Sequence, residues 1–319
     1  MDYGFSIPTR GVLANRESIL AMAKRGEELG FSYLALPDHI VIPRDIGSPY
    51  PYNTARKMVG ASEGDCLEQI ALMAYLAAAT STIRLLTSVM VVPHRPPMLT
   101  AKALATIDVL SQGRVTVGCG AGWMEEEFKA VGAPPFNERG QVTDEYLRIF
   151  KTLWTEDDPR FEGRYARFEN IIFLPKPVQK PHPPLWIGGE SPAALRRVIA
   201  LGDAWYPIGS NPQFPLDTAE RYSQALTRLR EEAGRAKRDP ASIDLAFWAS
   251  WYKEGQTGTT SDGKRQAFTG SDEEVAQDIV AYRSLGVRHL LFNFARETLS
   301  ESLAAVERFA SHVLPLAGR

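Results

Sequence analysis

Two stretches of the sequence decide the fold, RVTVGCGAGW at residues 114–123 and LWIGGESP at residues 185–192. Each begins as a short β-rich run, stops at glycines and then opens a helical pattern. Such a junction lets backbone N–H groups approach a ligand and directs the positive end of a helix dipole at any anion the ligand carries. Two junctions of this kind in one chain indicate a ligand lying across the strand ends of a parallel barrel.

Outward from these stretches, short apolar runs alternate with segments of helical periodicity along the whole chain. The pattern predicts an α/β fold, a single (β/α)8 TIM barrel that spans residues 1–319 as one domain, with loop insertions at its C-terminal face. The predicted strands are residues 3–7, 33–36, 84–92, 114–117, 185–188, 203–206, 243–252 and 289–294.

Composition limits the partners. The chain has 319 residues, a hydrophobic content of 44% and a formal net charge of -2, which favours neither nucleic acid nor an anionic membrane surface. Cys66 and Cys119 are the only cysteines, too few for a disulfide framework or a thiolate metal site. Without an export signal or a long apolar span, we expect a cytoplasmic protein with a small-molecule substrate.

Several phrases, in this order, resemble the bacterial luciferase-like superfamily, and within it the flavin- and deazaflavin (coenzyme F420)-dependent oxidoreductases. Any one phrase alone is weak evidence for the family, but the whole set in this order is specific to it. Besides the two stretches quoted above, the phrases are DH at 38–39, AATSTIRL at 78–85, LATIDVLSQGR at 104–114, QKPHPPLWIGG at 179–189 and LGDAW at 201–205.

Asp38 and His39 follow the second predicted strand, at the face where barrel enzymes keep their chemistry. An imidazole transfers protons near neutral pH, and Asp38 beside it is expected to steady a charged form or a ring nitrogen. The resemblance implies that His39 assists hydride transfer and that Asp38 contacts the cofactor ring. The alternative is a histidine that caps a loop beside a simple turn residue.

The resemblance also places a bulge with a non-prolyl cis peptide at Ser88-Val89, under the middle ring of a flavin-like tricycle. The alternative is an ordinary buried strand. Gly120, Ala121 and Gly122 would bring backbone close to the cofactor. Their phrase is no dinucleotide fingerprint, because Trp123 stands where that spacing requires glycine. The following run of Glu125, Glu126 and Glu127 is interpreted as complementing the helix dipole.

Gly188, Gly189, Glu190 and Ser191 are the better candidates for a phosphate site. The two glycines expose N–H groups, and Ser191 can cap the following helix while donating to a phosphate oxygen. The resemblance implies that the cofactor phosphate binds at this junction. The alternative is a capped helix without a ligand. The histidines show no metal-ligand spacing, so no metal site is predicted.

The predicted activity is hydride transfer between F420 and a small organic substrate, with FMN-dependent monooxygenation as the alternative. A non-catalytic flavin-binding barrel remains open. A hydrolase or aldolase barrel would need a metal cluster or a Schiff-base lysine at a strand end, and neither is evident. A homodimer is expected from the family alone. The substrate stays unidentified, because the segments expected to shape its pocket (residues 40–64, 160–180 and 255–270) are irregular loops.

Overall fold

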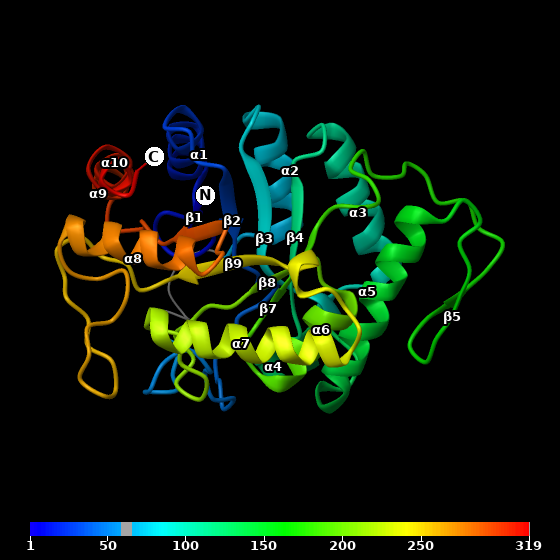
Figure 1. Ribbon diagram of the computed structural model, residues 1–319. Coiled ribbons are helices and arrows are strands. Elements are labelled where there is room, and N and C mark those ends of the chain that lie inside the picture. The colour runs from blue at the N-terminus through cyan, green and yellow to red at the C-terminus, as the bar shows by residue number, and fades with distance from the viewer. Residues whose placement is uncertain (59–65, 319) are drawn as a thin grey trace.

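Eight parallel strands close into a barrel in the order β1-β10-β9-β8-β7-β4-β3-β2, which confirms the predicted (β/α)8 architecture (Figure 1). The computed structural model describes residues 1–58 and 66–318, so positions 59–64 of the predicted loop 40–64 lie outside the described residues. The barrel strands are β1 (Asp2–Ser6), β2 (Tyr33–Leu36), β3 (Arg84–Val91), β4 (Val115–Gly120), β7 (Leu185–Gly188), β8 (Ala204–Tyr206), β9 (Asp244–Ala249) and β10 (His289–Phe292).

Helices cover the outside of the barrel, and local sequence signals explain where several of them begin. Asn15 and Ser191 cap α1 and α6 by accepting hydrogen bonds from backbone N–H groups of the first turn. The helices are α1 (Arg16–Glu28), α2 (Gln69–Ala79), α3 (Pro97–Leu110), α4 (Glu125–Ala130), α5 (Arg139–Thr155), α6 (Pro192–Leu201), α7 (Ala219–Arg235), α8 (Asp272–Ser284), α9 (Leu299–Arg308) and α10 (Leu314–Leu316). Short turns of helix are η1 (Val92–His94), η2 (Phe136–Glu138), η3 (Pro240–Ser242) and the π-helical η4 (Phe309–Val313).

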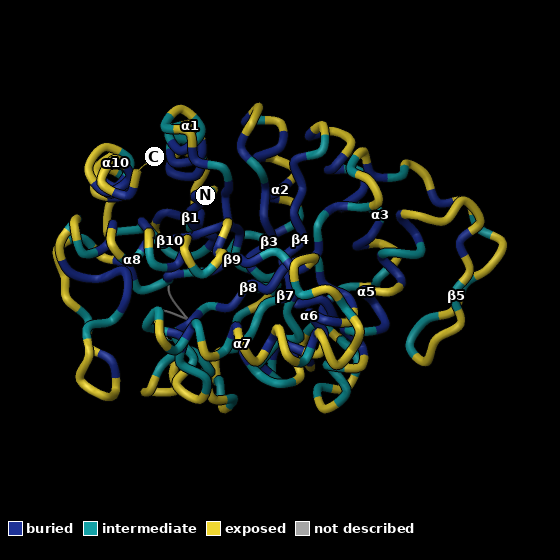
Figure 2. The backbone as a smooth tube through the Cα atoms, viewed as in Figure 1, coloured by how far each residue is buried: buried dark blue, intermediate teal, exposed yellow. Residues whose placement is uncertain are grey.

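The strands carry apolar side chains on both faces. In Figure 2 most of the strand backbone has the colour of buried residues. Inward-facing residues fill the lumen of the barrel, so it is a packed core and not a channel. The outward-facing residues pack under the helices in a second, larger cluster. The lumen cluster consists of Tyr33, Ala35, Leu86, Trp186, Ala204, Tyr206, Ala246 and Leu291.

β4 is longer than the sequence predicts. Its expected end was Val117, but the strand continues to Gly120 because Cys119 and Gly120 stay in register with Met90 and Val91 of β3. The glycines Gly118 and Gly120 of the first phrase therefore lie on the strand itself, and the backbone leaves the barrel at Ala121.

Residues 160–180 do not shape the pocket, contrary to expectation. They connect α5 to β7 and so approach the amino end of a strand, whereas the pocket lies at the carboxyl ends. The segment contains a short hairpin of β5 (Phe161–Glu162) and β6 (Arg167–Phe168), which projects from the right of the barrel in Figure 1. The Glu145 carboxylate holds its turn by accepting hydrogen bonds from the N–H groups of Arg164, Tyr165 and Ala166.

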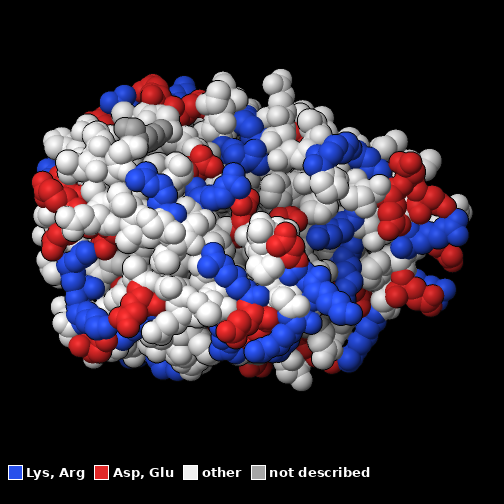
Figure 3. Space-filling model, viewed as in Figure 1, with Lys and Arg blue, Asp and Glu red and all other residues white. Residues whose placement is uncertain are grey.

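Charged side chains of both signs are interspersed over the face of the molecule in Figure 3, and neither sign forms a continuous field. Among the described residues, no helix is long and apolar enough to cross a membrane.

A buried histidine links three strands at the amino ends of the barrel. His289 of β10 has its Nδ1 at 3.1 Å from Asp2 of β1 and its Nε2 at 3.9 Å from Asp244 of β9. Its ring packs against Trp186, with ring centroids 4.7 Å apart. Burial acts to lower the pKa of His289, but the two carboxylates outweigh it and the net shift is upward.

We expect this histidine to make stability depend on pH. Because the pKa of His289 is raised on folding, its contribution is complete below the unfolded value of about 6.5 and is lost as pH rises through the folded value. The wild type should therefore lose more free energy of unfolding between pH 6 and pH 9 than His289→Gln. Urea unfolding at the two pH values measures this difference. His312→Gln, the same change at an exposed position, should keep the wild-type pH dependence; equal pH dependence in wild type and His289→Gln would refute the assignment.

Candidate cofactor-binding site

The two glycine phrases meet at one cavity. β4 pairs with β7 so that Gly118 lies opposite Trp186 and Cys119 opposite Ile187, which brings both phrases to neighbouring strand ends. A cavity of approximately 1330 Å³ opens there, lined by residues of both phrases and by Asp38 and His39. The convergence expected from the sequence is therefore present.

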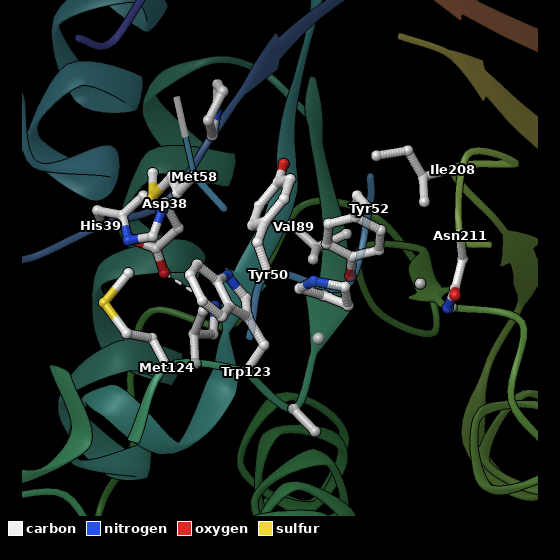
Figure 4. A pocket seen from close by; sticks show the side chains of 18 of the residues that line it. Asp38, His39, Tyr50, Tyr52, Met58, Val89, Trp123, Met124, Ile208 and Asn211 are labelled. Carbon is white, nitrogen blue, oxygen red and sulfur yellow. Dashed lines mark hydrogen bonds between the residues drawn. The ribbon is translucent and has the colours of Figure 1, made fainter. Parts of the chain in front are cut away.

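The floor of the cavity is a bulge in β3. The register between β3 and β4 shifts between Thr87 and Met90, and the Ser88-Val89 peptide is cis and non-prolyl, as the resemblance implied. The Ser88 hydroxyl is buried and hydrogen-bonded to the Tyr206 hydroxyl at 2.8 Å, so it is occupied within the protein. The side chain of Val89 is half-buried, lines the cavity and is the part of the bulge available to a ligand (Figure 4).

Glycines are required around this bulge because other groups take the space of a side chain. A Cβ on Gly118 would lie 2.0 Å from the Thr87 carbonyl oxygen. A Cβ on Gly120 or on Gly188 would lie 2.7 Å or 3.1 Å from the Val89 methyl groups. Bare backbone from β4 and β7 therefore flanks the Val89 side chain on the cavity floor.

His39 is oriented by Glu127 and not by Asp38. The distance from its Nδ1 to Glu127 Oε2 is 2.8 Å. The Asp38 carboxylate instead accepts two hydrogen bonds from Arg95, at 2.8 Å and 2.7 Å, and one from the N–H of Val91. The expectation that Asp38 steadies the imidazole is thus corrected: its charge is already paired, and the side chain ties β2 to the residues after the bulge.

The acidic run at the start of α4 does more than complement a helix dipole. Glu126 accepts hydrogen bonds from the N–H groups of Gly47 and Ser48, and the Ser48 hydroxyl accepts one from the N–H of Glu125. These contacts fasten the loop after β2 onto α4. Only Glu125, which pairs with Lys129 on the surface, matches the simple interpretation.

At the start of α6, Ser191 is the N-cap and accepts from the N–H of Ala194 at 3.2 Å. Gly189 has a φ of 101°, in the region that favours glycine. The Glu190 carboxylate turns away from this junction and accepts from the N–H groups of Ile208 and Gly209. Burial raises the pKa of Glu190, although these hydrogen bonds oppose the shift. Its side chain therefore anchors the loop after β8. Glu190 also lines the cavity, and its contact with a cofactor stays a prediction.

Aromatic side chains that the sequence did not single out cover part of the cavity. Tyr50 packs edge-on against Tyr52 and Trp123, with ring centroids 5.4 Å and 5.1 Å apart. Figure 4 shows the three rings near Val89, with His39 to one side. Trp248 also lines the cavity, whereas the Trp251 indole N–H donates to the Ala267 carbonyl.

A closed parallel barrel with a large cavity at its strand ends, lined by apolar and polar groups alike, is an architecture that places cofactor and substrate sites at the carboxyl ends of the strands. Residues 1–252 match the family model described as luciferase-like monooxygenase. The chain belongs to this family of enzymes.

The proteins that this chain resembles include enzymes named for two kinds of cofactor. The chain is 29% identical over 310 residues to an FMNH2-dependent dimethylsulfone monooxygenase of Pseudomonas putida, covering 85% of this chain and 84% of the relative. Among solved structures, it resembles the monooxygenase RslO1 of Streptomyces bottropensis, with a TM-score of 0.76, 22% identity and 99% of both chains covered. It also resembles an F420-dependent secondary alcohol dehydrogenase in complex with an F420-acetone adduct, with a TM-score of 0.74 and 18% identity. This match covers 100% of the present chain and 99% of the dehydrogenase. At such identities the structural likeness concerns the fold.

The close approach of Thr87 to Gly118 predicts that a side chain at position 118 lowers the stability of the fold. Gly118→Ala should lower the free energy of unfolding by about 3 kcal/mol, because the added methyl group meets a backbone carbonyl that cannot move without disturbing β3. Denaturant unfolding measures the loss. Gly234→Ala on α7 is the matched control: its Cβ meets nothing within 4 Å, so stability should stay equal or rise by about 0.5–1 kcal/mol. Wild-type stability in Gly118→Ala would contradict the contact.

Proposed function

We propose that this enzyme binds deazaflavin coenzyme F420 at the carboxyl ends of the strands and transfers hydride between the coenzyme and a small organic substrate. The observation that carries the proposal is the position of His39, which a buried carboxylate orients beside the cavity where the two glycine phrases meet. A histidine in such a position is suited to move the proton that accompanies a hydride.

The residues of the cavity fit a planar ring with an anionic tail. Val89 and the bare backbone of Gly120, Ala121 and Gly122 would hold the ring, since this part of the floor has no large side chain. The backbone at Gly188 and Gly189, together with Ser191 and the amino end of α6, would hold the phosphate. F420 supplies a two-electron hydride carrier to such a site.

Around the ring, the protein positions one proton-transfer group and limits water. Because Glu127 occupies Nδ1 of His39, Nε2 is the nitrogen left to give or take the substrate proton. The aromatic rings of Tyr50 and Trp123 cover part of the cavity, which reduces competing proton exchange with solvent. Asp38 is paired with Arg95 and accepts from the N–H of Val91, so it ties β2 to the residues that follow the bulge.

FMN-dependent monooxygenation is the second candidate. It is favoured by the similarity to the dimethylsulfone monooxygenase, which extends over most of both chains. The same floor and phosphate residues would serve FMN, so the choice between the cofactors is a matter of affinity and of turnover.

Titration with both cofactors tests the proposal. We expect F420 to quench the tryptophan fluorescence of the apoprotein, because Trp123 in the cavity wall contributes to this fluorescence. The Kd for F420 should be at least about tenfold lower than the Kd for FMN, which corresponds to a difference of about 1.4 kcal/mol in binding free energy. Riboflavin, which lacks the phosphate, is the control and should bind more weakly than FMN. Preference for FMN would select the second candidate. Binding of neither cofactor would remove the flavin assignment.

We also propose a homodimer, formed through α2. This helix has no charged residue, yet it has exposed residues three and four positions apart, which places them on one face of the helix. An apolar helix of this kind is normally covered on all sides, and a second copy of the same face would cover it. The exposed residues are Ala71, Ala74, Tyr75 and Ala78.

A charge on this face should separate the subunits. Ala74→Glu would place a carboxylate in the apolar interface, so we expect a monomer at concentrations where the wild type is a dimer. Light scattering coupled to size-exclusion chromatography measures the mass. Val280→Glu on α8, a similarly exposed apolar position, should leave the dimer intact. A monomeric wild type, or an unchanged Ala74→Glu dimer, would refute the interface.

A further inference from the structure

A buried carboxylate lies between two histidines under the wall of the cavity. Glu127 Oε2 is 2.8 Å from His39 Nδ1, and Glu127 Oε1 is 3.9 Å from His94 Nδ1. The side chains of Glu127 and His94 are each 1% exposed, and that of His39 is 13% exposed. Only His39 reaches the more open part of the site, so any effect of Glu127 on a bound substrate passes through this ring.

Glu127 is fixed in place by the backbone as well as by the ring. Its Oε1 accepts hydrogen bonds from the N–H of Ile40 at 2.8 Å and of Val41 at 3.3 Å. Those two residues follow His39 directly, so the same carboxylate sets both the course of the loop and the orientation of the imidazole. This double contact leaves Oε2 directed at His39.

The other titratable groups nearby do not compete for this interaction. Asp38 is paired with Arg95, which also binds Glu68. The Cys66 thiol is directed at the His39 carbonyl oxygen at 3.5 Å, and burial raises the pKa of this thiol. Neither ring nitrogen of His94 has a hydrogen-bond partner among the described residues, and burial lowers the pKa of His94, which keeps it neutral. His39 is therefore the side chain that pairs with Glu127.

We propose that Glu127 is the positioning residue of His39, which it holds with the hydrogen on Nδ1 so that the Nε2 lone pair faces the cavity. A neutral imidazole has one N–H, and a carboxylate only accepts hydrogen bonds. The 2.8 Å contact therefore selects one of the two tautomers. The catalytic consequence rests on the proposed function, in which His39 exchanges a proton with the substrate, whereas the tautomer itself does not.

Glu127→Gln separates this role from a purely structural one. The amide oxygen can still accept from Ile40 and Val41, which presents the amide N–H group to His39 Nδ1. The ring must then accept at Nδ1 and carry its hydrogen on Nε2. Nitrogen-15 NMR of histidine-labelled protein without cofactor reads the tautomer directly, with His39→Asn to assign the signals.

We expect the Nδ1–H form of His39 in the wild type and the Nε2–H form in Glu127→Gln. Glu126→Gln is the matched control, because it changes the neighbouring carboxyl group, which binds Gly47 and Ser48 and not His39, and it should keep the wild-type tautomer. An Nε2–H form in the wild type overturns the proposal even if the variant does not fold, and so does an unchanged tautomer in a folded Glu127→Gln.

Turnover gives the second readout. With whichever cofactor supports activity, Glu127→Gln should lower kcat about 100-fold with little change in KM, because general acid–base catalysis typically contributes at least this factor. An unchanged kcat in a Glu127→Gln variant whose tautomer has changed overturns the catalytic consequence of the proposal. If the tautomers behave as expected but neither F420 nor FMN supports turnover, the positioning role stands and the proposed function fails.

Discussion

The close approach of β3 to β4 at Thr87 and Gly118 is the constraint on which the rest of the site depends. The Thr87 hydroxyl donates to the Gly118 carbonyl at 2.8 Å, and the Thr87 carbonyl oxygen takes the space of a Gly118 side chain. The bulge that follows places Val89 on the cavity floor, and the Val91 N–H that comes after it meets Asp38 of the neighbouring β2 loop. One steric exclusion between two strands thus fixes the floor and the wall of the pocket together.

The barrel was predictable because its signals are local. The strands 33–36 and 185–188 were placed with the bounds that the structure has, since apolar runs between turn residues mark them clearly. Residue type and position alone identify Ser191 as a helix cap. The extension of β4 was missed because glycines normally signal the end of a strand, whereas here neighbours on both sides keep them paired.

The partners of the charged residues were not predictable in the same way. His39 and Asp38 are adjacent in sequence, yet each binds a residue far along the chain, Glu127 and Arg95. Such pairings depend on which strand ends become neighbours, and a run of three glutamates gives no sign of which member turns inward. One signal was available: Glu127 precedes Phe128, and both lie on the buried side of α4. Helical periodicity applied to the acidic run would have separated Glu127 from Glu125.

The hairpin before β7 has a consequence for how the enzyme can change. It is attached at the amino end of the barrel, and Glu145 of α5 alone supplies three acceptor contacts to its turn. Within the part of the chain that the structure describes, none of residues 156–184 lines the cavity. Its turn also binds Glu138, which stands between the cavity-lining residues Asn137 and Arg139. A tag or a change of length is therefore expected to spare the cavity only where it leaves these contacts of Arg164 and Tyr165 in place.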